Sequence, residues 1–205
     1  EGLSKAFGDR PQYEGRLDPA GAVNDPLLAG CLADLPEPNV AILDVGAGPL
    51  TTVGRMYPGK ELRITPIDPL ASHYDLILAN AGIIPPVRTV PGEGEKLLEQ
   101  FEPATFDIAH SANAIDHSYG PLLAISNMVE LVRPGGFVLL RHKRNEAEAN
   151  DYLGLHQWNF DVRDGRLVLW NRGSTFDIAE TVADRGDVRG EVRNGEVLCV
   201  VHRRE

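Results

Sequence analysis

The sequence predicts an α/β fold, in which a mainly parallel sheet carries helices on both faces and ends in an antiparallel hairpin. Two observations predict it. The apolar run 40–43 leads into Asp44 and the glycine turn Gly46-Ala47-Gly48, which is the start of a nucleotide-binding strand–turn–helix unit. The last two apolar segments flank Asn194-Gly195, a strong hairpin signal. Between them, apolar strand candidates alternate with helical ones.

Composition limits the class of protein. The 205 residues predict one domain, 1–205, in which residues 1–35 form an N-terminal flap and helix. No apolar run reaches the roughly 18 residues that a membrane helix needs, so no membrane partner is expected. Cys31 and Cys199 are isolated, which is typical of buried thiols in a reducing cytoplasm, and we expect a cytoplasmic protein. The net charge of -10 disfavours a nucleic-acid partner.

The remaining elements follow from the positions of apolar runs and turn residues. Before the glycine turn, we expect a helix over 27–35. After it, the predicted elements are helix 51–56, strand 62–68, helix 71–81, strands 85–90 and 106–110, helix 122–132 and strand 136–140. Further on, strands 158–162 and 166–170 join across Asp164-Gly165 and precede a helix over 175–183. We interpret 145–172 as an insertion on the substrate side.

Two motifs point to one family. A dinucleotide site expects a third glycine where Thr51 stands, so the turn disfavours a pyrophosphate. The fuller run Asp44-Val45-Gly46-Ala47-Gly48-Pro49 resembles motif I of the class I S-adenosylmethionine-dependent methyltransferases. The run Arg133-Pro134-Gly135-Gly136 resembles that family's turn into the fifth strand. The resemblance covers roughly residues 38 to 142, and implies a Rossmann-like seven-stranded sheet and S-adenosylmethionine as cofactor. The alternative is an ordinary α/β turn without a ligand.

The resemblance also implies cofactor-binding residues. It gives Asp44 the tasks of ordering the glycine loop and meeting the cofactor's amino group, with Gly46, Ala47, Gly48 and Pro49 beside it. Asp68 ends the second strand, where a carboxylate can accept both ribose hydroxyls, and Pro69 follows it. The alternative for Asp68 is a solvated acid at a strand end.

Two later segments complete the expected cofactor site. The resemblance implies that an acid after the third strand approaches the adenine amino group. Glu93 with Gly94 is the best match, Glu95 is the reserve, and an acidic first helical turn is the alternative. The fourth strand and the loop beyond it place polar residues at the edge where open α/β sheets bind ligands, namely His110, Ser111, Asn113, Asp116 and His117. Of these, we expect His110, Ser111 and Asn113 to bind the cofactor. This run resembles motif IV, but it lacks the Asp-Pro-Pro-Tyr of amino-group DNA methylases.

Three histidines are candidate general bases, since histidine removes protons near neutral pH. His117 lies in the motif IV loop, His142 follows the fifth strand, and His156 lies in a run of hydrogen-bonding residues. Each has a purely structural alternative. His142, Glu146 and His156 are metal-ligand types, but their spacing matches no tight zinc pattern, so no metal is expected.

We therefore expect a methyltransferase acting on a small molecule, by O-methylation of a sugar or secondary metabolite. The acceptor is expected over the fourth and fifth strands, between the motif IV loop and segment 142–159. The alternatives are transfer to nitrogen or to a protein side chain, or a non-catalytic cofactor-binding subunit. As to assembly, we expect a monomer or homodimer.

Overall fold

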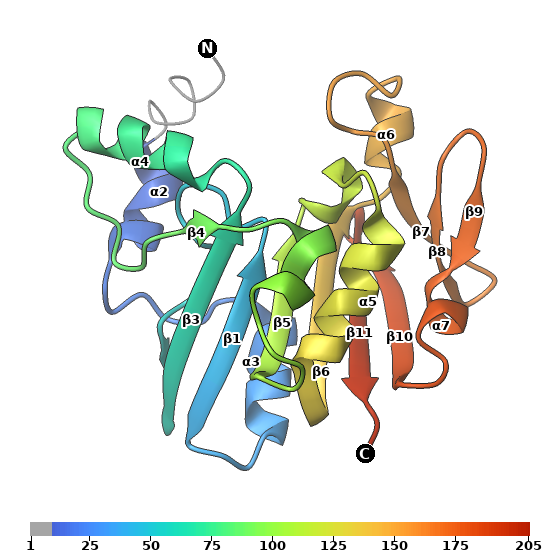
Figure 1. Cartoon of the computed structure of the whole chain (residues 1–205), viewed down its shortest axis with the longest axis horizontal. Coiled ribbons are helices and arrows are strands. Elements are labelled where there is room, and N and C mark those ends of the chain that lie inside the picture. Colours follow the sequence, from blue (N-terminus) through green and yellow to red (C-terminus); the bar gives the residue numbers. More distant parts are fainter. Residues whose placement is uncertain (1–9) are drawn as a thin grey trace.

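A computed structural model describes residues 10–205, and the first nine residues of the predicted N-terminal flap lie outside this range. In the described residues the central sheet has eight strands, in the order β10-β11-β6-β5-β1-β3-β2, and β4 also pairs with β3 (Figure 1). Their bounds are β1 Asn39–Val45, β2 Met56–Tyr57, β3 Lys60–Asp68, β4 Val90–Pro91, β5 Phe106–Ala112, β6 Val132–Lys143, β10 Gly186–Arg193 and β11 Glu196–Arg203.

The strand directions confirm the predicted Rossmann-like sheet. Strands β4, β3, β1, β5 and β6 run parallel, so their carboxyl ends share one edge. Strands β11 and β10 form the predicted terminal hairpin, antiparallel to β6. These seven strands form the expected sheet, and β2 adds two antiparallel residues beside β3. The edge shared by the parallel strands is where a ligand is expected.

Helices cover both faces of the sheet, as predicted. The helical elements are α2 Arg10–Leu17, α3 Pro26–Asp34, α4 Ala71–Asn80, η1 Gly94–Glu99, η2 Ile115–His117, α5 Pro121–Leu131, α6 Glu146–Ala149 and α7 Ile178–Thr181. Helix α5 lies in front of the sheet in Figure 1 and buries Ile125 and Met128. Helix α3 lies behind it, buries Leu28 and Leu32, and is capped by Asp25, which accepts from the amide of Leu27. None of the helices in residues 10–205 is long and apolar enough to cross a membrane.

The helix predicted over 51–56 is wrong, because residues 49–55 form turns and bends that lead into β2. Thr51 donates its hydroxyl to Asp44 and accepts the amide of Val53, which fixes a non-helical turn. A Cβ on Gly54 would lie 2.3 Å from the carbonyl oxygen of Ala22, so the segment packs directly on the chain before β1. Local hydrogen bonding and this close packing therefore replace the helix.

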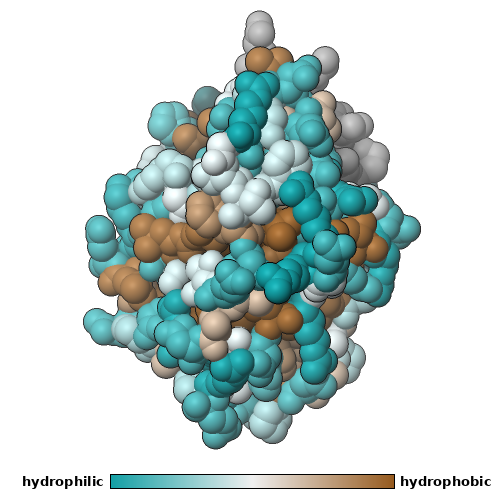
Figure 2. All heavy atoms as spheres, turned by 90° about the vertical axis from the view of Figure 1, so that its right-hand side faces the viewer, coloured by the Kyte–Doolittle hydropathy of each residue, from teal (hydrophilic) through white to brown (hydrophobic). Residues whose placement is uncertain are grey.

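The segment after β6 forms a second sheet of β7 Asn159–Arg163, β8 Arg166–Trp170 and β9 Thr175–Asp177. The predicted β7–β8 hairpin is confirmed. The helix predicted over 175–183 is only α7, because β9 pairs with β8 first and Asp177 then caps the helix. Similarly, the strand predicted over 85–90 is reduced to β4. Figure 2 faces this side of the molecule and shows a band of apolar residues crossing a mostly hydrophilic surface.

Candidate functional site

The glycine turn after β1 is held against the neighbouring strand. Gly46 and Gly48 have φ angles of +72° and +66°, which favour glycine. The amides of Gly46 and Ala47 both donate to the carbonyl of Ile67, at 2.9 and 3.0 Å. A Cβ on Gly46 would lie 2.2 Å from the Cβ of Ala114, so the motif IV loop rests directly on this glycine. The turn and the loop therefore form one surface.

Asp44 anchors this surface from below. It is 2% exposed, and its Oδ2 accepts the Thr51 hydroxyl at 2.5 Å while its Oδ1 lies 2.7 Å from Nδ1 of His110. Thr51, which stands where a dinucleotide site has glycine, is thus a functional residue that sequence reasoning missed. Its hydroxyl three residues beyond the Gly46–Gly48 turn was the available signal.

Two residues of the expected cofactor set have another role. His110 is buried against Asp44, and Ser111 is fully buried and donates its hydroxyl to the carbonyl of Val45 at 2.8 Å. In the described part of the chain, neither lines the two pockets described next. His110 and Ser111 join β5 to β1 beneath the site, and their expected contact with the cofactor stays a prediction.

A pocket of about 490 Å³ opens over the carboxyl ends of β1, β3 and β4. Its lining includes Gly46, Asp68, Pro69, Tyr74, Glu93, Gly94, Ile115, His117, Tyr119 and Leu155. Asp68 is buried and accepts the amides of Gly48 at 3.0 Å and Leu70 at 2.8 Å, one on each oxygen. Each carboxylate oxygen has a second lone pair, so Asp68 can still accept hydroxyl groups of a ligand. Burial, followed by the nearby Asp68, raises the pKa of Tyr74 to about 12.

Glu93 stands at the side of this pocket. It pairs with Lys96 at 2.9 Å and accepts the Tyr119 hydroxyl at 3.2 Å. The hydrogen bond from Lys96 lowers the pKa of Glu93, so this side chain is an anion that can accept from a ligand. Glu95 instead accepts the amide of Gly120, which favours Glu93 for the ligand.

A second pocket, of about 250 Å³, lies on the other side of Gly46. The glycine turn forms its floor, and its lining includes Asp44, Ala47, Gly48, Pro49, Asn113, Arg16 and Arg141. Helix α2 supplies Arg16, whose Nη1 lies 3.4 Å from the carbonyl of Leu50. Two arginines border this pocket together with the buried Asp44, and Arg141 also pairs with Asp25 at 3.3 Å. Arg16 is therefore the side chain here that best suits an anionic group.

The three candidate histidines converge on one carboxylate. Oδ2 of Asp116 lies 3.0 Å from Nδ1 of His156 and 3.2 Å from Nε2 of His117, and these two nitrogens are 2.9 Å apart. Nδ1 of His142 lies 3.5 Å from Oδ1 of Asp116. The sequence placed Asp116 at the ligand-binding edge of the sheet, beside His117 in the motif IV loop, but assigned it no catalytic or cofactor role.

Burial separates the members of this cluster. Asp116 is 2% exposed, and although burial would raise its pKa, His142, His156 and His117 lower it to about 2. His142 is 1% exposed, its ring stacks on Phe160 at 4.0 Å, and burial lowers its pKa. Its buried ring faces Asp116, which disfavours direct contact with an acceptor, and a catalytic role of His142 stays a prediction. His117 and His156 are partly exposed.

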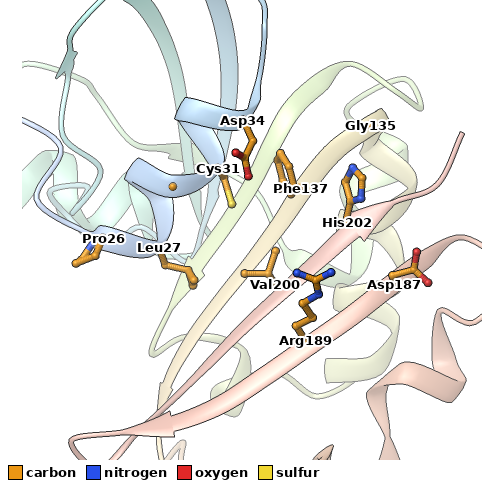
Figure 3. A pocket seen from close by; sticks show the side chains of 11 residues that line it. Pro26, Leu27, Cys31, Asp34, Gly135, Phe137, Asp187, Arg189, Val200 and His202 are labelled. Carbon is orange, nitrogen blue, oxygen red and sulfur yellow. The ribbon is translucent and has the colours of Figure 1, made fainter.

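Two larger hollows, of about 580 and 660 Å³, lie away from this edge of the sheet. Figure 3 shows the first, a groove between α3 and strands β10 and β11 into which Leu27, Phe137 and Val200 project. None of the predicted site residues lines it. The convergence of predicted residues, rather than pocket size, therefore identifies the site.

Comparisons with known proteins agree on the fold. Residues 43–140 match a family model described as a methyltransferase domain. No protein of curated function matches the chain in sequence. The PH0226 protein of Pyrococcus horikoshii OT3 is similar in structure, with a TM-score of 0.52 and 15% identity over 87% of this chain and 88% of that chain.

Two further structures are similar. The CurJ carbon methyltransferase has a TM-score of 0.57 and 15% identity over 87% of this chain, which spans 52% of that chain. The 1,6-didemethyltoxoflavin-N1-methyltransferase of Burkholderia thailandensis, with bound 1,6-didemethyltoxoflavin and S-adenosylhomocysteine, has a TM-score of 0.51 and 16% identity over 99% of this chain and 86% of that chain. At these identities the likeness concerns the fold.

Proposed function

We propose that the chain, whose residues 43–140 match a methyltransferase domain, is a class I S-adenosylmethionine-dependent methyltransferase and that it methylates a hydroxyl of a small polar molecule, such as a sugar or a secondary metabolite. One observation carries the choice of acceptor. Asp116, His117 and His156 form a polar cluster beside the pocket over β1, β3 and β4, and His117 lines that pocket.

The two pockets on either side of Gly46 fit the two ends of the cofactor. In the larger pocket, Asp68 can accept ribose hydroxyls, and Glu93 can accept from the adenine amino group, with Pro69 and Gly94 beside them. In the smaller pocket, Arg16 best suits a carboxylate, with Arg141 beside it. The residues that would hold this end are Asp44, Gly46, Ala47, Gly48, Pro49 and Asn113. Gly46 lines both pockets, which supports a ligand that runs past this glycine from one pocket to the other.

The cofactor supplies a methyl group on a positively charged sulfur, so the protein's task is to place the acceptor and remove its proton. A hydroxyl is a weak nucleophile until its proton is removed, whereas an amine in its neutral form is nucleophilic without a base. His117 and His156 lie together at the edge of the pocket, and Asp116 orients them. This arrangement therefore supports an oxygen acceptor. A base within hydrogen-bond reach typically contributes about 10² to 10⁴-fold to the rate.

A screen of metabolite extracts with labelled cofactor tests the proposal, together with calorimetry using S-adenosylhomocysteine. His156→Ala should lower methyl transfer by about 100-fold or more and leave cofactor affinity nearly unchanged. Asp68→Ala should weaken cofactor binding instead. His73→Ala, on the exposed side of α4, is the matched control and should change neither. If His156→Ala retains full turnover per folded molecule, the proposed role of the cluster is wrong.

A further inference from the structure

The contacts within the Asp116–His117–His156 cluster cannot all be hydrogen bonds. Three atoms, Oδ2 of Asp116, Nε2 of His117 and Nδ1 of His156, lie 2.9 to 3.2 Å from one another. The carboxylate oxygen only accepts, so both nitrogens must carry a hydrogen to bond it. Two N–H groups would then face each other across 2.9 Å. If only one of the two nitrogens carries a hydrogen, the lone pair of the other nitrogen faces the carboxylate oxygen. No protonation state satisfies all three contacts, whereas a cation shared by the three atoms does.

The spacing of the three atoms matches a transition-metal site. Metal–nitrogen and metal–oxygen bonds to such ligands measure about 2.0 to 2.2 Å. The three atoms lie 2.9 to 3.2 Å from one another. If an ion lay about 2.1 Å from each of them, the angles between its three bonds would be about 90°. This is one triangular face of an octahedron, the arrangement of two histidines and one carboxylate that leaves the other positions open. Imidazole ligands favour zinc, copper, iron or nickel over magnesium or calcium.

We propose that Asp116, His117 and His156 bind one divalent transition-metal ion at the edge of the cofactor pocket. The expectation of a metal-free protein rested on sequence spacing around His142, Glu146 and His156. That set is not the one the fold assembles, because Glu146 pairs with Lys143 at 2.8 Å. The ligands instead come from η2 and from the loop before β7, separated by about 40 positions in the sequence.

The surroundings of the ligands hold them in place. The carbonyl of Asp116 accepts the amides of Gln157 and Trp158, both at 3.3 Å, which ties the loop carrying His156 to η2. Oδ1 of Asp116 faces His142, whose ring is fixed by its stack on Phe160. A metal-bound carboxylate commonly has such a partner on its other oxygen. His142 is thus a positioning residue for the site.

Binding of the ion does not depend on the proposed function, and only the effect of the ion on the acceptor hydroxyl rests on that function. If the acceptor hydroxyl lies over the cluster, the ion offers it an open coordination position and lowers its pKa, as a bound metal does for water. The histidines then serve as ligands, and the proton leaves to solvent. The acceptor class remains a hydroxylated small molecule.

Metal binding itself is the test. Protein stripped with a chelator is titrated with Co²⁺ and with Zn²⁺, and binding is followed by calorimetry and by the visible absorption of the cobalt ion. We expect one ion per chain. His117→Ala and His156→Ala should each weaken binding by more than about 100-fold, because loss of an outer-shell partner alone costs 10 to 100-fold. Both side chains are partly exposed, so these variants should fold.

His73→Ala is the control for binding at surface histidines and should bind as the wild type does. The inference is overturned if the wild type binds no ion, or if the ion that it binds is lost in His73→Ala. It is likewise overturned if His117→Ala and His156→Ala both bind the ion as the wild type does. Full methyl transfer by chelator-treated protein would overturn the role of the ion in activating the acceptor. In each of those cases a loss of transfer in His156→Ala would still support the proposed function, so the two can fail separately.

Discussion

Gly46 and Gly48 form a matched pair that tests how closely the glycine turn and the motif IV loop depend on each other. Both have left-handed φ angles, +72° and +66°. Alanine in that conformation costs roughly 1–2 kcal/mol at either position. Only at Gly46 does an added Cβ meet a neighbour, the Cβ of Ala114 at 2.2 Å, whereas at Gly48 nothing lies within 4 Å. The difference between Gly46→Ala and Gly48→Ala therefore isolates this one contact.

The size of the difference follows from the contact. Ordinary carbon contacts begin near 3.4 Å, so the turn and the loop must move apart by about 1 Å in Gly46→Ala. Overpacking of this kind typically costs about 1–3 kcal/mol. Gly48→Ala should lower the melting temperature by about 2–8 °C, at 2–4 °C per kcal/mol for a domain of this size. Gly46→Ala should lower it further, and should weaken S-adenosylhomocysteine binding about tenfold more than Gly48→Ala.

Thermal unfolding and calorimetry measure both effects, and a third variant checks the cause. In Gly46→Ala combined with Ala114→Gly, the next neighbour of the new Cβ is the Cα of residue 114 at 3.6 Å, an ordinary contact. The pair should therefore show a favourable coupling energy of about 1–3 kcal/mol. If the two glycine variants weaken binding equally and Ala114→Gly restores nothing, the steric argument is refuted.

Three other expectations can be checked directly. Thr51→Val removes the hydroxyl that Asp44 accepts and should lower the free energy of unfolding in urea by about 1–3 kcal/mol, whereas exposed Thr52→Val should change it by less than about 0.5 kcal/mol. Burial raises the pKa of Cys31 and Cys199 to about 12, so at pH 8 both stay as thiols and should react with a disulfide reagent only after unfolding; rapid labelling of the native protein would contradict this. The net charge of -10 predicts no retention of RNA or duplex DNA at physiological salt, and salt-sensitive binding would argue against it.

Local patterns predicted the sheet well because strand periodicity, glycine turns and hairpin dipeptides act over a few residues. The same patterns could not show that Asp44 holds Thr51 and His110, since that triangle needs strands far apart in the sequence. The burial of His142 did have a signal. Val138, Leu140 and His142 alternate along β6, so all three point to the same buried face.

The residues on the acceptor side show more clearly what the sequence alone could not predict. His117 and His156 could each be chosen for their chemistry, but their meeting on Asp116 depends on a loop that folds back over 40 positions. Likewise, helix propensity after the glycine turn predicted a helix, and tertiary packing of Gly54 on Ala22 prevented it. Residue type identified the candidates, and long-range contacts decided which of them act together.

The missing helix after the glycine turn changes how the anionic end of a ligand is recognised. A helix placed there would present backbone amides and a dipole, which no side-chain substitution removes. Here the positive charge comes from Arg16, before the sheet begins, and from Arg141, near the end of β6. Side-chain charges at a partly open pocket are screened by salt. Affinity for the anionic end of the ligand should therefore fall as ionic strength rises. Substitution of a single arginine is enough to change this affinity during evolution.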